Sequence, residues 1–69
     1  MNVDQIRQKI TNGFKPFTLC LSDGRKLPVP HPDFVAVGRH IVVVIGQDDS
    51  VKTIDPLHLV SLEEKPAKR

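Results

Sequence analysis

Apolar and polar residues alternate along residues 17–22, and this is the clearest pattern in the chain. Phe17, Leu19 and Leu21 occupy every second position, and smaller residues occupy the positions between them. A period of two places successive side chains on opposite faces of a strand. The pattern therefore predicts a β-strand with one apolar face.

A hairpin turn is predicted directly after this strand. Asp23-Gly24 favours a tight turn because such turns need positive φ angles, which glycine adopts without strain. Residues 25–29 are then expected to form the return strand. Pro28 lies within it and cannot donate a ladder hydrogen bond, so this strand is predicted at the edge of a sheet.

Residues 35–45 are the richest part of the chain in β-forming residues. Gly38 interrupts them and marks either a tight turn or a bulge. Residues 41–45 are uninterrupted apolar residues, so we expect a central strand that is packed on both faces.

Turns and strands continue to the end of the predicted domain. Residues 46–49 are typical of a turn, and residues 50–54 are predicted as the next strand. Residues 55–58 are compatible with one 3₁₀ turn. Residues 59–62 are predicted as the last strand.

A short helix is predicted near the N-terminus. Val3, Ile6 and Ile10 recur at spacings of three and four, as expected of one helix face. Asn2 is a suitable N-cap, and Asp4 complements the positive end of the helix. A helix of about eight residues is too short to be stable alone, so we expect it to pack on the strands.

These elements predict a mainly β fold: a short N-terminal α-helix followed by a small, five-stranded, bent antiparallel barrel of the SH3 or Sm type. Residues 1–63 would form one domain. Residues 64–69 would be a charged, disordered tail.

Charge changes the functional picture. The chain has ten basic and eight acidic residues, a net charge of +2. Three of the basic residues, Lys65, Lys68 and Arg69, lie in the predicted tail; without them seven basic residues face eight acidic ones, a balance of −1. Nucleic-acid affinity depends largely on neutralising phosphates, so this balance does not favour RNA or DNA as a partner.

If a nucleic-acid surface exists, its candidate residues are the cations beside the predicted turns: Arg25, Lys26, Arg39 and Lys52. The chain has no Trp or Tyr on which bases could stack. The alternative is that these four residues belong to an ordinary solvated surface.

His31 and Asp33 form a candidate corner site. Imidazole and carboxylate groups are metal ligands, but the same residues also suit a turn in which Asp33 caps backbone N–H groups. We favour the turn and predict no metal and no cofactor. Cys20 lies within a predicted strand, with no feature that would activate its thiol, so we predict no catalytic residue and no enzyme.

The longest uninterrupted apolar run has five residues, 41–45, far fewer than the ~20 that cross a bilayer. The N-terminal residues lack the apolar core of a secretion signal. Cys20 is the only cysteine, which suits a reducing compartment. We therefore expect a cytoplasmic protein that does not enter membranes.

The segment PFTLCLSDGRKLPVPHPDF resembles the signature of a group of short bacterial proteins. These share an N-terminal helix, a PF-x-L-x-L-x-DGR segment and a following HPDF. The resemblance covers residues 1 to about 63 and implies no particular activity.

In architecture the chain is also similar to bacterial Sm-like proteins of the Hfq type, which have an N-terminal helix and five strands. Leu19, Leu21, Gly24 and Leu27 fit the spacing of the first Sm motif. The Tyr-Lys-His-Ala-Ile run of the Hfq uridine pocket is absent; Asp55-Pro56-Leu57-His58-Leu59 stands near its place, with Asp55 adding negative charge.

The leading functional prediction is a non-enzymatic binding or assembly module that forms homo-oligomers through strand edges. The face of residues 18, 20 and 22 and the segment 57–62 are the expected edges. An unknown protein partner is the other form of this prediction. The alternative function is Sm-like RNA or DNA binding.

Overall fold

The computed structural model describes residues 2–64 of the chain. Its elements are, in order, α1 (Val3–Thr11), β1 (Phe17–Leu21), β2 (Lys26–Val29), η1 (Pro32–Phe34), β3 (Val35–Val37), β4 (Val42–Ile45), β5 (Val51–Ile54), η2 (Pro56–His58) and β6 (Leu59–Glu64), where η denotes a 3₁₀ helix. The predicted mainly β fold with one short N-terminal helix is confirmed.

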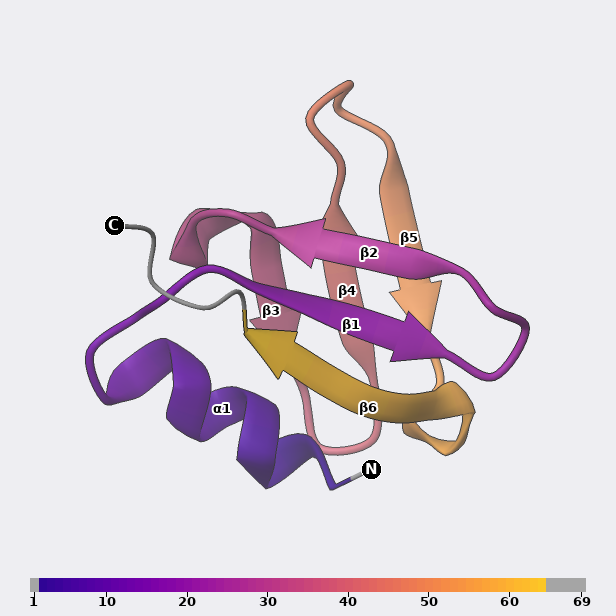
Figure 1. Ribbon diagram of the computed structural model, residues 1–69, viewed down its shortest axis with the longest axis horizontal. Coiled ribbons are helices and arrows are strands. Elements are labelled where there is room, and N and C mark those ends of the chain that lie inside the picture. The colour runs from indigo at the N-terminus through magenta and orange to yellow at the C-terminus, as the bar shows by residue number, and fades with distance from the viewer. Residues whose placement is uncertain (1, 65–69) are drawn as a thin grey trace.

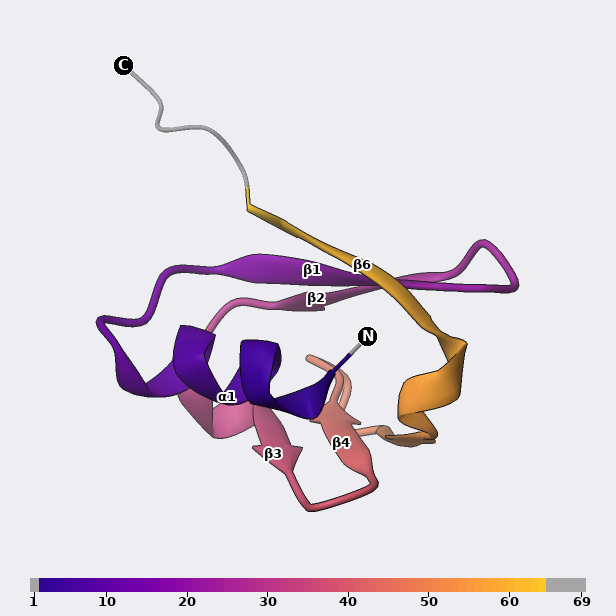
Figure 2. The same cartoon turned by 90° about the horizontal axis from the view of Figure 1, so that it is seen from below.

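The strands form two antiparallel sheets of three strands each. Their orders are β2-β1-β6, called here sheet A, and β3-β4-β5, called sheet B. Figures 1 and 2 show the sheets as two crossed layers, with α1 along one open side between them. Among the described residues the strands do not close into a barrel, and they number six rather than the predicted five.

The extra strand arises at Gly38. Its N–H donates to the carbonyl oxygen of Ile41 at 2.8 Å, which makes a tight turn between β3 and β4. Of the two alternatives for Gly38, the turn is therefore confirmed. It divides the β-rich stretch into two strands that pair with each other.

Both ends of α1 are capped, and the N-cap is the predicted Asn2. The Asn2 side chain accepts a hydrogen bond from the Asp4 N–H at 2.8 Å, and the Asn12 N–H donates to the Gln8 carbonyl at 3.0 Å. Ile6 is completely buried, so packing against the sheets holds this short helix. No helix within residues 2–64 has the length and apolarity that a membrane span requires.

The β1–β2 connection is a three-residue loop. The Leu21 N–H donates to the Arg25 carbonyl at 2.9 Å, and the Gly24 N–H donates to the Leu21 carbonyl at 3.0 Å. Gly24 has a φ of 91°, in the left-handed region that glycine adopts freely. The β4–β5 loop has the same pattern with Asp49, at φ 67°, in the equivalent position.

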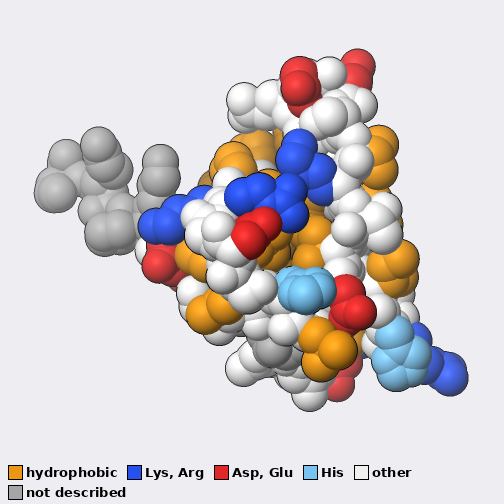
Figure 3. Space-filling model, turned by 90° about the vertical axis from the view of Figure 1, so that its right-hand side faces the viewer, with side chains coloured by type: hydrophobic (Ala, Val, Ile, Leu, Met, Phe, Trp, Pro, Cys, Tyr) orange, Lys and Arg blue, Asp and Glu red, His pale blue; other side chains and the backbone are white. Residues whose placement is uncertain are grey.

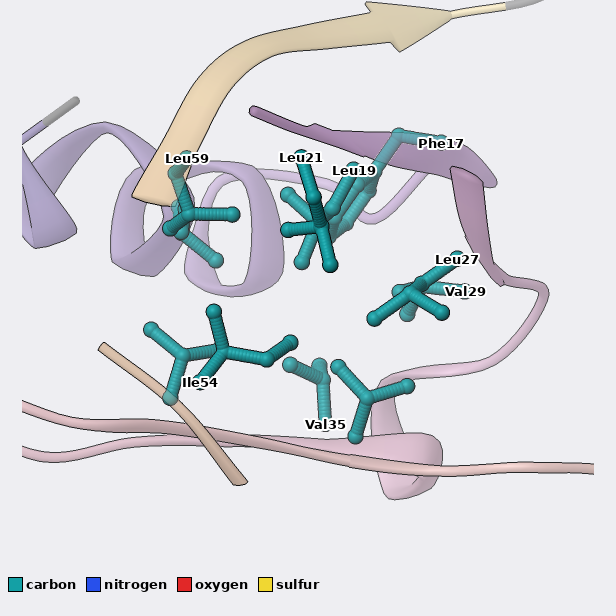
Figure 4. Close-up of a cluster of buried hydrophobic side chains, with 11 residues drawn as sticks. Phe17, Leu19, Leu21, Leu27, Val29, Val35, Ile54 and Leu59 are labelled. Atoms are coloured by element: carbon teal, nitrogen blue, oxygen red, sulfur yellow. The ribbon is translucent and has the colours of Figure 1, made fainter. Parts of the chain in front are cut away.

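The core lies between the two sheets. The three apolar residues of β1, Phe17, Leu19 and Leu21, are all buried, which confirms the predicted alternation. Figure 4 shows them pointing toward Val35 and Ile54 of sheet B. β6 continues to Glu64, two residues beyond its predicted end, and the rest of the predicted tail lies outside the described residues.

The prediction that residues 41–45 pack on both faces is wrong. β4 is the central strand of sheet B, as predicted, but only Val42 and Val44 are buried, whereas Val43 and Ile45 are partly exposed. The strand is central within its sheet, yet the sheet has a covering layer on one side only (Figure 2).

Candidate functional site

The four cations predicted as a nucleic-acid surface come from three separate parts of the fold. Arg25 and Lys26 lie at the β1–β2 end, Arg39 in the β3–β4 turn and Lys52 in β5. Asp, Glu and His side chains are interspersed with the Lys and Arg side chains on the face in Figure 3.

Three of these cations have partners. Arg25 pairs with Asp23 at 2.8 Å, Lys26 Nζ lies 3.8 Å from Glu63, and Lys52 Nζ donates to Ser50 Oγ at 3.1 Å. Arg39 has no such partner within residues 2–64.

The corner residues His31 and Asp33 have a structural role. The Asp33 N–H donates to His31 Nδ1 at 3.1 Å, so the imidazole, and not Asp33 as predicted, caps the short helix η1. The Asp33 carboxylate lies 3.6 Å from the same nitrogen, and the His31 ring is 6.2 Å from that of Phe34. No group of three or more metal-ligating side chains occurs within residues 2–64.

A cleft of about 290 Å³ opens at the end of the molecule where the β1–β2 loop meets η2. Figure 3 looks onto this end and shows apolar atoms at the bottom of a hollow with charged and His side chains around it. We call this hollow the end cleft. Its lining residues come from β1 and its loop, from the end of β5 and from η2: Leu21, Ser22, Asp23, Arg25, Thr53, Ile54, Asp55 and His58.

Asp23 and Arg25 are bound to each other at the rim of the end cleft. The Arg25 N–H donates to Asp23 Oδ1 at 3.0 Å and Arg25 Nε donates to Asp23 Oδ2 at 2.8 Å. The backbone hydrogen bond, followed by the side-chain hydrogen bond and the charge of Arg25, holds the pKa of Asp23 below its ordinary value. The terminal nitrogens Nη1 and Nη2 of Arg25 have no partner within residues 2–64.

Ser22 and His58 meet in the end cleft although they are 36 positions apart. Ser22 Oγ lies 3.4 Å from His58 Nδ1, and the Ser22 N–H donates to the His58 carbonyl at 2.8 Å. A serine nucleophile needs its base to be oriented by a third group. Asp55 is the carboxylate nearest to His58 in the sequence, but its Oδ1 accepts the Leu57 N–H and caps η2 instead of orienting the imidazole.

Sequence reasoning missed this pair. The sequence placed Ser22 at the end of the predicted strand 17–22 and His58 in the predicted 3₁₀ turn 55–58, with nothing to connect the two. The one signal that could have found the pair is the pairing of β1 with β6, which sets Leu21 beside Leu59 and so brings the neighbouring residues together.

The outer face of sheet B is a second candidate site. The register places Ala36, Val43 and Thr53 side by side on one face, with Ile45 beside Val51 on the same face. Val51 is 65% exposed, and neither Val43 nor Ile45 packs against the core cluster. This face is therefore apolar, uncharged and uncovered by the described residues.

The outer face of sheet A differs. The register places Cys20 beside Lys26 and Ser61, and Thr18 beside Glu63. This polar and charged face is typical of an antiparallel sheet with one side in solvent. The thiol of Cys20 is free and half-buried there. Of the two outer sheet faces, that of sheet B is therefore the apolar one.

The strand edges, in contrast, are all protected. β1 is central in sheet A, so the predicted edge at residues 18, 20 and 22 is wrong. β2 is an edge strand, as predicted. Pro28 and Thr18 form a pair that exchanges no backbone hydrogen bonds. The backbone nitrogen of Pro28 therefore points away from β1, toward the free edge of the sheet, where its missing N–H leaves nothing for a further strand to bind. The edge strand β5 turns Lys52 to the inner face, a charge that a further strand would bury.

The other two edges adjoin α1. At β3, the Arg7 guanidinium donates to the Gly38 carbonyl at 3.0 Å. At β6, a register shift makes Val60 an extra, bulged residue, and Lys9 of α1 pairs with Glu64. Segment 57–62 thus comprises most of η2 and the first part of an edge strand with a bulge.

Comparison with protein-family models, with curated proteins and with solved structures finds no significant match for this chain.

Proposed function

We propose that this protein is a non-enzymatic assembly module whose contact surface is the outer face of sheet B. The observation that supports the proposal is the partly exposed row of aliphatic side chains on that face, led by Val43, Ile45 and Val51. Covering such a row with a partner removes apolar surface from water, which favours association. The contact passes through a face and not through strand edges, because each edge carries a feature that opposes pairing.

A second copy of the chain fits this surface best. A partner must bring an apolar surface without charge, because an unpaired charge buried against Val43 would be costly. The outer face of sheet B itself has these properties, so two copies can pack face to face around a two-fold axis. The described body carries a balance of only −1, so electrostatic repulsion between copies is small.

The size of the face limits its affinity. Three strands ~4.8 Å apart and at most four residues long, at ~3.4 Å per residue, cover roughly 200 Å² of flat area at most. Stable interfaces bury about 800 Å² per partner. We therefore expect a weak, reversible dimer that forms at hundreds of micromolar, and that strengthens where other contacts hold copies together.

Nucleic-acid binding is the alternative function, and the geometry favours it less. Three of the four candidate cations are engaged with partners, and Arg39 stands apart from the end cleft. In nucleic-acid binding, Arg39 and Lys52 would have to act without an aromatic side chain on which bases could stack.

We propose no catalytic role for the Ser22–His58 pair, since it lacks an orienting carboxylate.

We further propose that the fold is an open barrel of the SH3 or Sm type. If β2 and β3 are two halves of one bent strand interrupted by η1, six strands reduce to the five of an SH3 or Sm-like barrel that is left open. The strand order, with β6 beside β1 and η2 before β6, supports this assignment. The single, half-buried Cys20 suits a reducing compartment, and we propose the cytoplasm.

The test is the mass in solution of two matched lysine variants. Val43→Lys places a charge at the centre of the outer face of sheet B. Thr18→Lys is the control, because it makes the same change of a β-branched residue at the central strand of sheet A. Sedimentation equilibrium from 10 µM to 1 mM would measure association, and circular dichroism would verify that both variants fold.

The expected result is a concentration-dependent dimer for the wild type and for Thr18→Lys, and a monomer throughout for Val43→Lys. A wild type that stays monomeric at 1 mM would reject the proposal. So would a dimer that both variants leave intact or both abolish. A mass of six or seven chains would point instead to the ring assembly of Sm-like proteins.

A further inference from the structure

We infer that the end cleft binds a carboxylate carried on a small apolar group, such as the C-terminal residue of a peptide. This inference is independent of the proposed assembly, because the end cleft opens between the β1–β2 loop and η2 and its Thr53 is the one lining residue shared with the outer face of sheet B.

Arg25 supplies the recognition of the carboxylate. Asp23 engages its backbone N–H and Nε, which fixes the base of the guanidinium and leaves Nη1 and Nη2 with no partner among the described residues. Those two nitrogens can donate parallel hydrogen bonds to both oxygens of a carboxylate, the geometry in which arginine binds most specifically. Ser22 and His58 add polar residues to the wall of the same hollow.

Leu21 and Ile54 supply the apolar part of the site. Each is only 5% exposed, and together they lie beneath the polar rim of the end cleft. A volume of about 290 Å³ is at the lower end of the range for ligand sites, which suits one amino-acid residue and not a larger molecule. The combination of an arginine fork and an apolar floor therefore selects a small amphipathic acid.

Asp55 opposes anions, and it opposes a doubly charged ligand more strongly than a singly charged one. One of its oxygens caps η2, and its negative charge remains at the cleft wall. A dianion such as phosphate would be repelled more strongly than a carboxylate at this position. Asp55→Asn should therefore tighten binding of the carboxylate, provided that the amide oxygen keeps the cap on the Leu57 N–H.

Three small probes separate the contributions. N-acetyl-leucine carries both the carboxylate and the apolar side chain, N-acetyl-leucinamide lacks the charge, and acetate lacks the side chain. Each would be titrated to 50 mM against isotope-labelled full-length protein, at 50 µM so that dimers are scarce. Backbone amide shifts around the end cleft would report binding.

Arg25→Gln and Arg39→Gln are the matched variants. Both remove one exposed guanidinium, but only Arg25 lines the end cleft. We expect N-acetyl-leucine to bind the wild type with millimolar affinity and to shift the cleft amides, and each of the other two probes to bind at least fivefold more weakly. The affinity of Arg25→Gln for N-acetyl-leucine should fall at least fivefold, whereas Arg39→Gln should bind it as the wild type does.

The absence of cleft shifts at 50 mM N-acetyl-leucine would overturn the inference. Equal binding of the amide probe would do so too, as would equal losses in the two glutamine variants. None of these results bears on the mass of Val43→Lys, so failure of this inference and failure of the proposed assembly remain distinguishable.

Discussion

Two neighbouring valines in β4 offer a direct measurement of which face of sheet B is covered. Val42 is fully buried against the core, whereas Val43 faces outward and is partly exposed. Val42→Ala and Val43→Ala delete the same two methyl groups from the same strand. The two variants lose the same β-propensity, so the difference between them isolates burial.

The magnitude follows from the methyl groups removed. At ~0.8 kcal/mol per buried CH₂ group, Val42→Ala loses about 1.6 kcal/mol of transfer free energy, and the residual cavity raises the loss to about 2–3 kcal/mol. Val43→Ala should lose less than about 1 kcal/mol, because its methyl groups already contact water. A 69-residue domain has a total stability of only about 3–10 kcal/mol, so the difference is easily resolved.

Urea unfolding at ~10 µM, a concentration at which the proposed dimer is dissociated, would measure both variants. Circular dichroism is the suitable signal because the chain has no Trp or Tyr. Val42→Ala should also melt roughly 10 °C below Val43→Ala, given 4–8 °C per kcal/mol in domains of this size. Equal destabilisation of the two variants at this concentration would refute the reasoning, since it would mean that Val43 is buried within a single chain.

The remaining predictions concern acid and the η1 cap. The hydrogen bonds to Asp23 from Arg25, to Asp48 from Ser50 and to Glu64 from Lys9 all lower carboxyl pKa values in the folded protein. As the pH falls, these carboxylates therefore take up protons in the unfolded chain before they do so in the folded protein. Their contribution to stability is present above the ordinary pKa values of 3.8 for Asp and 4.5 for Glu, and it is lost as the pH falls through and below those values. The urea midpoint should fall from pH 5 to pH 3, and less so in Lys9→Gln; a midpoint that rises would contradict the assignment. His31→Ala should lower the free energy of unfolding by about 1 kcal/mol, because it removes the acceptor for the Asp33 N–H. His31→Asn should keep most of that stability, because an asparagine side chain can accept the same hydrogen bond. Equal urea midpoints for these two variants would exclude the capping role.

Elements whose signals are local could be predicted from the sequence. The spacing of Val3, Ile6 and Ile10 with the Asn2 cap defined α1 to within one residue at its C-terminal end. The period-two pattern of residues 17–22 identified both faces of β1, and Pro28 placed β2 at an edge. In each case the determining residues lie within about two helical turns or a few strand positions of each other, so tertiary packing did not alter the outcome.

Features that depend on distant segments could not be predicted in this way. Gly38 was compatible with a turn or a bulge, and only the pairing of Val37 with Val42 distinguishes them. The Ser22–His58 contact requires β6 to return beside β1 across more than 30 residues. The four cations come from three separate parts of the fold, since Arg25 and Lys26 lie together at the β1–β2 end, Arg39 in the β3–β4 turn and Lys52 in β5.

The uncovered face of sheet B shows the limit of periodicity most clearly. Residues 42–44 are three identical valines, so no local pattern can tell which of them faces a covering layer. An apolar run in the centre of a sheet predicts layers on both sides, and the described chain supplies only one. Its single helix is already used to close the side between the two sheets (Figure 2). The described chain thus covers only one of the two apolar faces of β4, and in the dimer proposed above the outer face of a second sheet B would cover the other.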